Sequence, residues 1–177
     1  MAKIEVEVRS FISREKYEEL LEWFFEHGEL TKKDYQETYY YDCDQDLRIQ
    51  RNSFESKIWL KKGELHDEAR EEIEIKTDRE KFGELEQLFD ELGYGVDIKW
   101  FRHRHKYDWD GVKVCLDHTK GYGYILELEI QCLESEKGAM LAKLKTKMSE
   151  LDIEITPKDE FDQAYEYYKT NWEELTK

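Results

Sequence analysis

Charged and aliphatic residues alternate strictly near the start of the chain, in the stretch Glu5-Val-Glu-Val-Arg9. Successive side chains of a β-strand point to opposite faces, so this stretch is expected to present one charged and one aliphatic face. The same Glu-x-Glu pattern returns at residues 72–74 and 127–129. Three such strands restrict the fold, because each apolar face must be covered by another element.

An amphipathic helix is predicted directly after each of these three strands, because apolar residues recur there at i, i+3 and i+4. The first two helices are predicted to end at Gly28 and Gly93, since glycine is common just past a helix end. We expect the helices to pack on the aliphatic strand faces, including that of Ile73 and Ile75. The expected helix stripes are Tyr17, Leu20, Leu21, Phe24 and Phe25, then Phe82, Leu85, Leu88, Phe89 and Leu92, then Met140, Leu141, Leu144 and Met148.

Further strands are predicted between and after these units, with a turn at Asp110-Gly111 joining two of them. About eight short strands with three or four helices indicate an α+β domain built around a largely antiparallel sheet. Eight antiparallel strands can close into a barrel, which leaves no exposed sheet edge, with the helices packed outside. The additional strand segments are residues 35–43, 46–52, 56–63, 98–109 and 112–117.

The chain is expected to form one domain over residues 1–177, since its length suits a single core. Its last part, about residues 159–175, has the pattern of an amphipathic helix. This helix either caps one end of the barrel or makes a dimer contact, and the sequence does not decide between the two.

The charged strand faces are expected to line the inside of the barrel, with acids and bases on different strands. One alternative is a solvated sheet face with ordinary Glu/Lys cross-strand pairs. Repetition favours a charged lumen, in which many charges would be costly unless they were paired or bound to metal. A polyphosphate bound through a divalent ion would use both kinds of charge. Besides the three Glu-x-Glu pairs, the lining would include Arg48, Lys57, Trp59, Lys61, Arg102, Arg104, Lys113 and Asp117.

Composition excludes several classes of function. The net charge of −15 argues against a broad nucleic-acid or anionic-membrane surface. The three cysteines have no CxxC spacing, so neither a disulfide framework nor a thiolate zinc site is indicated. No Walker A, GxSxG or HExxH motif is present. Without a long apolar run or a signal-peptide pattern, a cytoplasmic protein is expected.

Six short motifs in order resemble the CYTH superfamily, also called triphosphate tunnel metalloenzymes. This superfamily includes class IV adenylate cyclases, thiamine triphosphatases and inorganic triphosphatases. The resemblance spans roughly residues 3 to 131 and implies an eight-stranded tunnel. The matching segments are Glu5 to Arg9 for ExExK, Leu47 to Gln50 for LRIR, the strand ending at Lys61, Glu72 with Glu74, Arg102 to Tyr107 for KxRxxY, and Asp117 to Glu129 for LDxxxGxGxxxExE.

The resemblance implies a role for each matched side chain, with Mg²⁺ or Mn²⁺ as cofactor. It implies Glu5, Glu7 and Arg9 as catalytic residues, and Glu72 and Glu74 as a supporting acidic wall. The implied metal ligands are Glu5, Glu7, Asp117, Glu127 and Glu129. The implied triphosphate ligands are Arg9, Arg48, Lys61, Arg102, Arg104 and Lys113.

Two positions depart from the family pattern. Arg9 stands where the family usually has lysine, and Gln50 stands where a second arginine is usual. Arginine and lysine are not equivalent at a point-charge position, so both departures bear on turnover more than on fold.

Three functions follow as hypotheses. The first is metal-dependent hydrolysis of inorganic tripolyphosphate, thiamine triphosphate or a nucleoside triphosphate. The second is conversion of ATP to cyclic AMP, as in a class IV adenylate cyclase. The third is non-catalytic binding of triphosphate or polyphosphate. In each case the expected partner is a small-molecule triphosphate, with no nucleic acid and no membrane, and the protein is a monomer or a homodimer.

Overall fold

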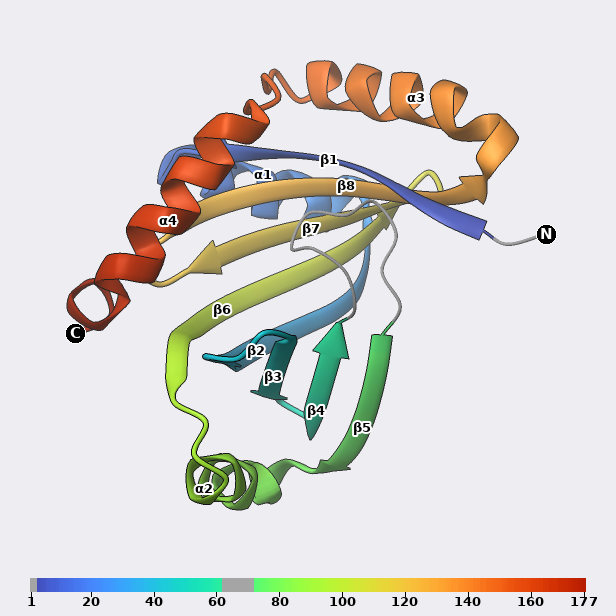
Figure 1. The fold of residues 1–177 in the computed structure, drawn as a ribbon. Coiled ribbons are helices and arrows are strands. Elements are labelled where there is room, and N and C mark those ends of the chain that lie inside the picture. Colours follow the sequence, from blue (N-terminus) through green and yellow to red (C-terminus); the bar gives the residue numbers. More distant parts are fainter. Residues whose placement is uncertain (1–2, 62–71) are drawn as a thin grey trace.

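Residues 3–61 and 72–177 are described by a computed structural model, except for the side chains of Lys3, Lys61 and Glu72. In these two ranges the chain forms eight strands and four α-helices (Figure 1). The elements are β1 (Lys3–Ile12), α1 (Arg14–His27), β2 (Glu29–Tyr41), β3 (Asp46–Arg51), β4 (Glu55–Lys61), β5 (Glu72–Asp78), α2 (Phe82–Glu91), β6 (Val96–Trp109), β7 (Val112–Thr119), β8 (Gly123–Leu133), α3 (Lys137–Glu150) and α4 (Lys158–Leu175).

All eight strands belong to one sheet, in the order β1-β8-β7-β6-β2-β3-β4-β5, and each neighbouring pair is antiparallel. The predicted α+β architecture with a largely antiparallel sheet is therefore confirmed. The sheet is strongly curved, and β1 and β5 are its two ends (Figure 1). Within the described ranges no strand pair joins β5 to β1, so hydrogen bonds do not close the expected barrel.

The larger core lies between one face of β1, β8, β7 and β6 and the helices α1 and α3. Leu116, Leu126 and Leu128 are fully buried there, together with Phe24 of α1 and Leu144 of α3. The side chain of Ser13 caps α1 by accepting a hydrogen bond from the backbone of Lys16, and the helix ends at Gly28 as predicted. The aliphatic faces of these strands and the first and third helix stripes thus pack as expected, except that Phe25 of the first stripe is 83% exposed.

A smaller core holds α2 against the same side of β2, β3 and β4. Phe82 and Phe89 of the predicted stripe are buried, whereas Leu88 and Leu92 of the same stripe are exposed. Residues 79–81 form a turn of 3₁₀-helix before α2, which is therefore short. The expected packing of Ile73 and Ile75 under a helix is wrong, because this short helix leaves both side chains of β5 exposed.

The last helix, α4, lies across one end of the opposite sheet face (Figure 1). Phe161 stacks on Phe11 with ring centroids 4.3 Å apart, and Tyr168 packs edge-on against Trp100 at 4.8 Å. The Tyr168 hydroxyl also donates to the carbonyl of Lys99 at 2.7 Å. These contacts hold α4 against β1 and β6, and the choice between a cap and a dimer contact stays a prediction.

The β6–β7 hairpin turns at the predicted dipeptide. Asp110 and Gly111 both have positive φ, 54° and 74°, which is the backbone of a two-residue hairpin loop. None of the helices in the described part of the chain is long and apolar enough to cross a membrane.

Candidate functional site

The sheet face opposite α1, α2 and α3, here called the inner face, carries the charged residues. Strand register brings them together, with Glu7 opposite Glu129 and Arg9 opposite Glu127 across β1 and β8. Arg104 of β6 lies opposite Asp117 of β7. Alternation along each strand fixes this face, because the neighbouring aliphatic residues are in the core.

Four carboxyl groups gather where β1 and β8 meet: those of Glu5, Glu7, Glu127 and Glu129. Burial, with the neighbouring charge of Glu127, raises the pKa of Glu7 from the ordinary 4.5 to about 7. Burial and Glu129 raise the pKa of Glu5 in the same direction. Both shifts follow from partial desolvation of this corner of the inner face and from repulsion between its carboxylates.

The thiol of Cys115 lies in the same cluster. Its sulfur and one carboxylate oxygen each of Glu127 and Glu129 all lie within 4.8 Å of one another. Burial raises the pKa of Cys115 to about 12, so without a metal its thiol stays protonated. These three atoms form a compact set of donors that could hold a divalent ion.

Next to the acidic cluster lies a partly buried pair of arginines. Arg104 makes a two-pronged ion pair with Asp117, with N–O distances of 2.7 and 2.5 Å, and Glu127 is 3.7 Å away. Arg102 donates twice to the amide oxygen of Gln36 and lies 3.5 Å from Asp117. Burial would raise the pKa of Asp117, but the two arginines outweigh it and lower that pKa.

Lys113 lies at the more open edge of the cluster. Its ammonium is 2.7 Å from Glu129 and 3.7 Å from Glu5, and about half of its side chain is exposed. The hydrogen bond to Glu129 raises the pKa of Lys113. The predicted residues of β1, β6, β7 and β8 are therefore brought together in one continuous region.

The predicted residues of β3, β4 and β5 form a separate group. Arg48 makes a two-pronged pair with Asp46 at 2.6 Å and lies over the rings of Tyr40 and Trp59, at 4.3 and 5.2 Å. Glu74 accepts a hydrogen bond from Lys57 at 2.6 Å. The predicted ligand Lys61 and the predicted wall residue Glu72 have side chains outside the described residues.

Several inner-face residues were not among the predicted site residues: Asp46, Gln36 and Cys115. Cys115 stood in the predicted strand between Lys113 and Asp117, where period two already placed it beside them. Gln36 stood near the start of the predicted strand at residues 35–43. In the structure it lies in the middle of β2, because that strand already begins at Glu29. Asp46 marks the start of β3 and shares its face with Arg48, so the same period could have found it.

Both departures from the family pattern have a structural context. The guanidinium of Arg9 lies 4.5 Å from the ring centre of Phe161 in α4, a contact that suits a planar cation. Gln50 donates to the hydroxyl of Thr38 at 2.8 Å on the inner face. The neighbouring Arg51 points to the other face and pairs with Glu37. The inner face of β3 therefore carries Arg48 as its one arginine.

Fold and site together define a curved antiparallel sheet that carries sorted carboxylates and arginines on its inner face. The model of the CYTH domain family matches residues 3–164, and the chain belongs to that family. The resemblance inferred from the motifs is thereby confirmed.

Solved structures with the same fold cover most of the chain. A conserved hypothetical protein from Pyrococcus furiosus has 21% identity and a TM-score of 0.69 over 87% of this chain and 96% of that one. The PH1819 protein from Pyrococcus horikoshii OT3 has 28% identity and a TM-score of 0.66 over 85% and 92%. HpAC1 from Hippeastrum, described as having a dominant triphosphatase activity, has 20% identity and a TM-score of 0.63 over 87% and 90%. A comparison with curated proteins found no match.

Proposed function

We propose that this protein hydrolyses a triphosphate compound on the inner face of its sheet, with the help of a divalent metal ion. The observation that carries the proposal is the arrangement of a carboxylate cluster directly beside partly buried arginines, around Glu127 and Arg104. Carboxylates bind hard cations, and arginines bind phosphoryl oxygens in pairs of hydrogen bonds. The candidate substrates are inorganic tripolyphosphate, thiamine triphosphate and nucleoside triphosphates.

The residues of the acidic cluster fit a divalent ion. Burial and the neighbouring Glu127 raise the pKa of Glu7 to about 7, and a bound cation would offset both effects. Glu5, Glu7, Glu127 and Glu129 would hold Mg²⁺ or Mn²⁺. A bound ion would neutralise charge on the phosphate oxygens as the transition state forms. Asp117 is already ion-paired with Arg104 and Arg102, so we assign it the role of positioning these arginines and do not count it as a metal ligand.

The arginines would bind the phosphate chain. Asp117 and Gln36 fix the orientation of Arg104 and Arg102 before any ligand arrives. Fixed donors stabilise developing charge better than mobile ones, because they need no reorganisation during the reaction. A water oxygen forms a bond to the terminal phosphorus as the bond to the bridging oxygen breaks, giving phosphate, the shortened phosphate compound and a proton.

The proposal includes a tunnel that encloses the ligand, with α4 as a cover at one end. The contacts of Phe161 with Arg9 and Phe11 support such a cover. Three expectations stay predictions. They are the monomeric or homodimeric state, the cytoplasmic location, and the roles of Lys61 and Glu72.

Phosphate release tests the proposal. Tripolyphosphate, thiamine triphosphate and ATP are each incubated with Mg²⁺, Mn²⁺ or EDTA, and we expect release from at least one of them in the presence of metal only. The double variant Glu5→Gln, Glu7→Gln should lose about a hundred-fold or more of this activity. The matched control Glu22→Gln, on the exposed side of α1, should keep it.

Two outcomes would contradict the hydrolase. Cyclic AMP found by mass spectrometry as the main product from ATP would identify a cyclase. A melting temperature raised by tripolyphosphate, with no product from any substrate, would identify a binding protein without turnover.

A further inference from the structure

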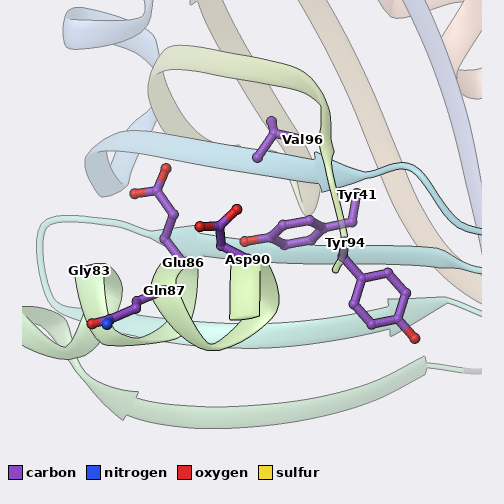
Figure 2. Close-up of a pocket in the computed structure, with 7 residues that line it drawn as sticks. All are labelled: Tyr41, Gly83, Glu86, Gln87, Asp90, Tyr94 and Val96. Carbon is purple, nitrogen blue, oxygen red and sulfur yellow. The ribbon is translucent and has the colours of Figure 1, made fainter. Parts of the chain in front are cut away.

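A pocket lies on the outer side of the sheet, away from the candidate site on the inner face. It is formed where α2 and the segment after it meet the end of β2, and its volume is about 370 Å³ (Figure 2). Tyr41, whose ring is part of the smaller core, forms its inner wall. The lining residues are Tyr41, Gly83, Glu86, Gln87, Asp90, Tyr94 and Val96.

The hydroxyl of Tyr41 has no hydrogen-bond partner in the described part of the protein, although the side chain is only 5% exposed. Its ring packs against Phe89 with centroids 4.7 Å apart, which fixes the direction of the hydroxyl. Figure 2 shows this hydroxyl pointing to the side of the pocket where Glu86 and Asp90 project. A buried hydroxyl without a partner is rare in proteins and calls for a ligand or another explanation.

Two carboxylates face this hydroxyl from successive turns of α2. Glu86 has one cationic neighbour, since the ammonium of Lys99 lies 3.3 Å away while resting over the ring of Tyr39. Asp90 has no cation within salt-bridge distance among the described residues. Burial and both carboxylates raise the pKa of Tyr41 to about 12, so the phenol is neutral and can accept or donate a hydrogen bond.

We propose that this pocket binds a small organic cation with a primary ammonium group. An ammonium has three N–H donors, and Glu86, Asp90 and the Tyr41 hydroxyl offer three acceptors. Tyr94 and Val96 provide aromatic and aliphatic surface for the carbon chain that carries the ammonium. Gly83 leaves its side of the pocket open, because an added Cβ there would have no neighbour within 4 Å.

A divalent metal ion fits the pocket less well. The cavity is far larger than one ion, and its walls include two aromatic rings and one valine. Metal ions of this kind prefer a close shell of oxygen atoms. The competing interpretation is an acidic, solvated helix face that binds nothing, and it predicts no saturable binding.

Calorimetric titration of the full chain with 1,4-diaminobutane tests the proposal. We expect saturable binding that weakens at least about ten-fold in Asp90→Asn and several-fold in Tyr41→Phe, which loses one acceptor but keeps the ring. Glu91→Gln is the matched control, because Glu91 lies on the same helix and does not line the pocket. Its affinity should stay within about two-fold of the wild type.

Two further arms locate the site and identify the chemistry. Glu7→Gln should leave the affinity unchanged, since Glu7 belongs to the inner face. Tetramethylammonium, which has no N–H donor, should bind much more weakly than the diamine. The proposal is overturned if diaminobutane does not bind, if Asp90→Asn binds it as well as the wild type, or if Mg²⁺ displaces it from the pocket at lower concentration.

Discussion

The two halves of the sheet differ in how their charges are balanced. On β3, β4 and β5 the carboxylates of Asp46 and Glu74 have close cationic partners, and the hydrogen bond from Lys57 lowers the pKa of Glu74. On β1 and β8 the carboxylates of Glu5 and Glu7 have raised pKa values. The comparison teaches that the carboxylates of β1 resist ionisation, because burial and neighbouring carboxylates act together there, which makes the β1–β8 half the one that an added cation would stabilise.

The outer faces of the halves differ in the same direction. Two helices bury the aliphatic residues of β1, β6, β7 and β8, whereas α2 is the one helix among the described residues that covers the other half. Leu128 is fully buried, while Ile75 is 58% exposed. The half with the unbalanced charges therefore has the more rigid support, as a site with fixed geometry requires.

The largest effect is expected from Asp117→Asn. This change removes the charge of the buried Asp117, so Arg104 and Arg102 lose their carboxylate partner, and breaking a buried pair costs about 3–5 kcal/mol. Urea unfolding should show this loss in the free energy of unfolding. A loss below about 1 kcal/mol would mean that solvent reaches the arginines and that the halves do not differ in this respect.

The next largest effect is expected from shortening one aliphatic side chain in each half of the sheet, which should lower the free energy of unfolding by different amounts. Leu128→Ala should lower the free energy of unfolding by about 2–5 kcal/mol, because it opens a cavity under α1 and α3. Ile75→Ala, the matched change on β5, should cost less than about 1 kcal/mol, because the side chain is mostly exposed. Equal losses would show that β5 is covered in solution.

A smaller effect concerns pH. The pKa of Glu7 is about 7 in the folded protein and 4.5 in its ordinary state, so folding takes up a proton between these values. The contribution of Glu7 to stability is therefore greatest below pH 4.5 and is lost as the pH rises through 7. The Glu7 side chain keeps some contact with solvent on the concave inner face, which weakens the effect, so we expect a decline on the order of 1 kcal/mol.

Unfolding measured between these pH values in wild type and Glu7→Gln tests this expectation. The difference between the two curves should show the decline, and saturating Mg²⁺ should reduce it. Parallel curves for the two proteins would mean that Glu7 titrates normally.

The smallest effect is expected for Glu74→Gln on β5. The ion pair with Lys57 is partly exposed, and such pairs contribute about 0–1 kcal/mol. Chemical denaturation should therefore place this variant close to the wild type, in contrast to Asp117→Asn. A large loss would show that the pair is buried in solution.

The strand faces could be predicted because period two admits few alternatives once one face is apolar. Val8 and Leu128 must be in the core, so Glu7 and Glu127 must be on the other side. The family motifs then added the order of the strands along the chain. Both inferences depend on residues close together in the sequence, and these can be read from a single chain.

Three features could not be read from the sequence because they depend on distant packing. The ion pair of Arg48 with Asp46 depends on which other charged side chains of the folded sheet come within reach of them. The exposure of Ile75 depends on where α2 ends relative to β5. The hydroxyl of Tyr41, which has no partner among the residues that the structure describes, depends on the position of α2 against β2.

The pairing of β1 with β8 has a consequence for the time course of folding. These partners are far apart in sequence, and even the pair with the shortest separation joins Ile12 to Tyr124. The chain must lose the entropy of a very long loop before this pairing stabilises it, and such topologies fold slowly. The carboxylate cluster between the two strands therefore forms late, so a cation that binds there should slow unfolding more than it speeds folding.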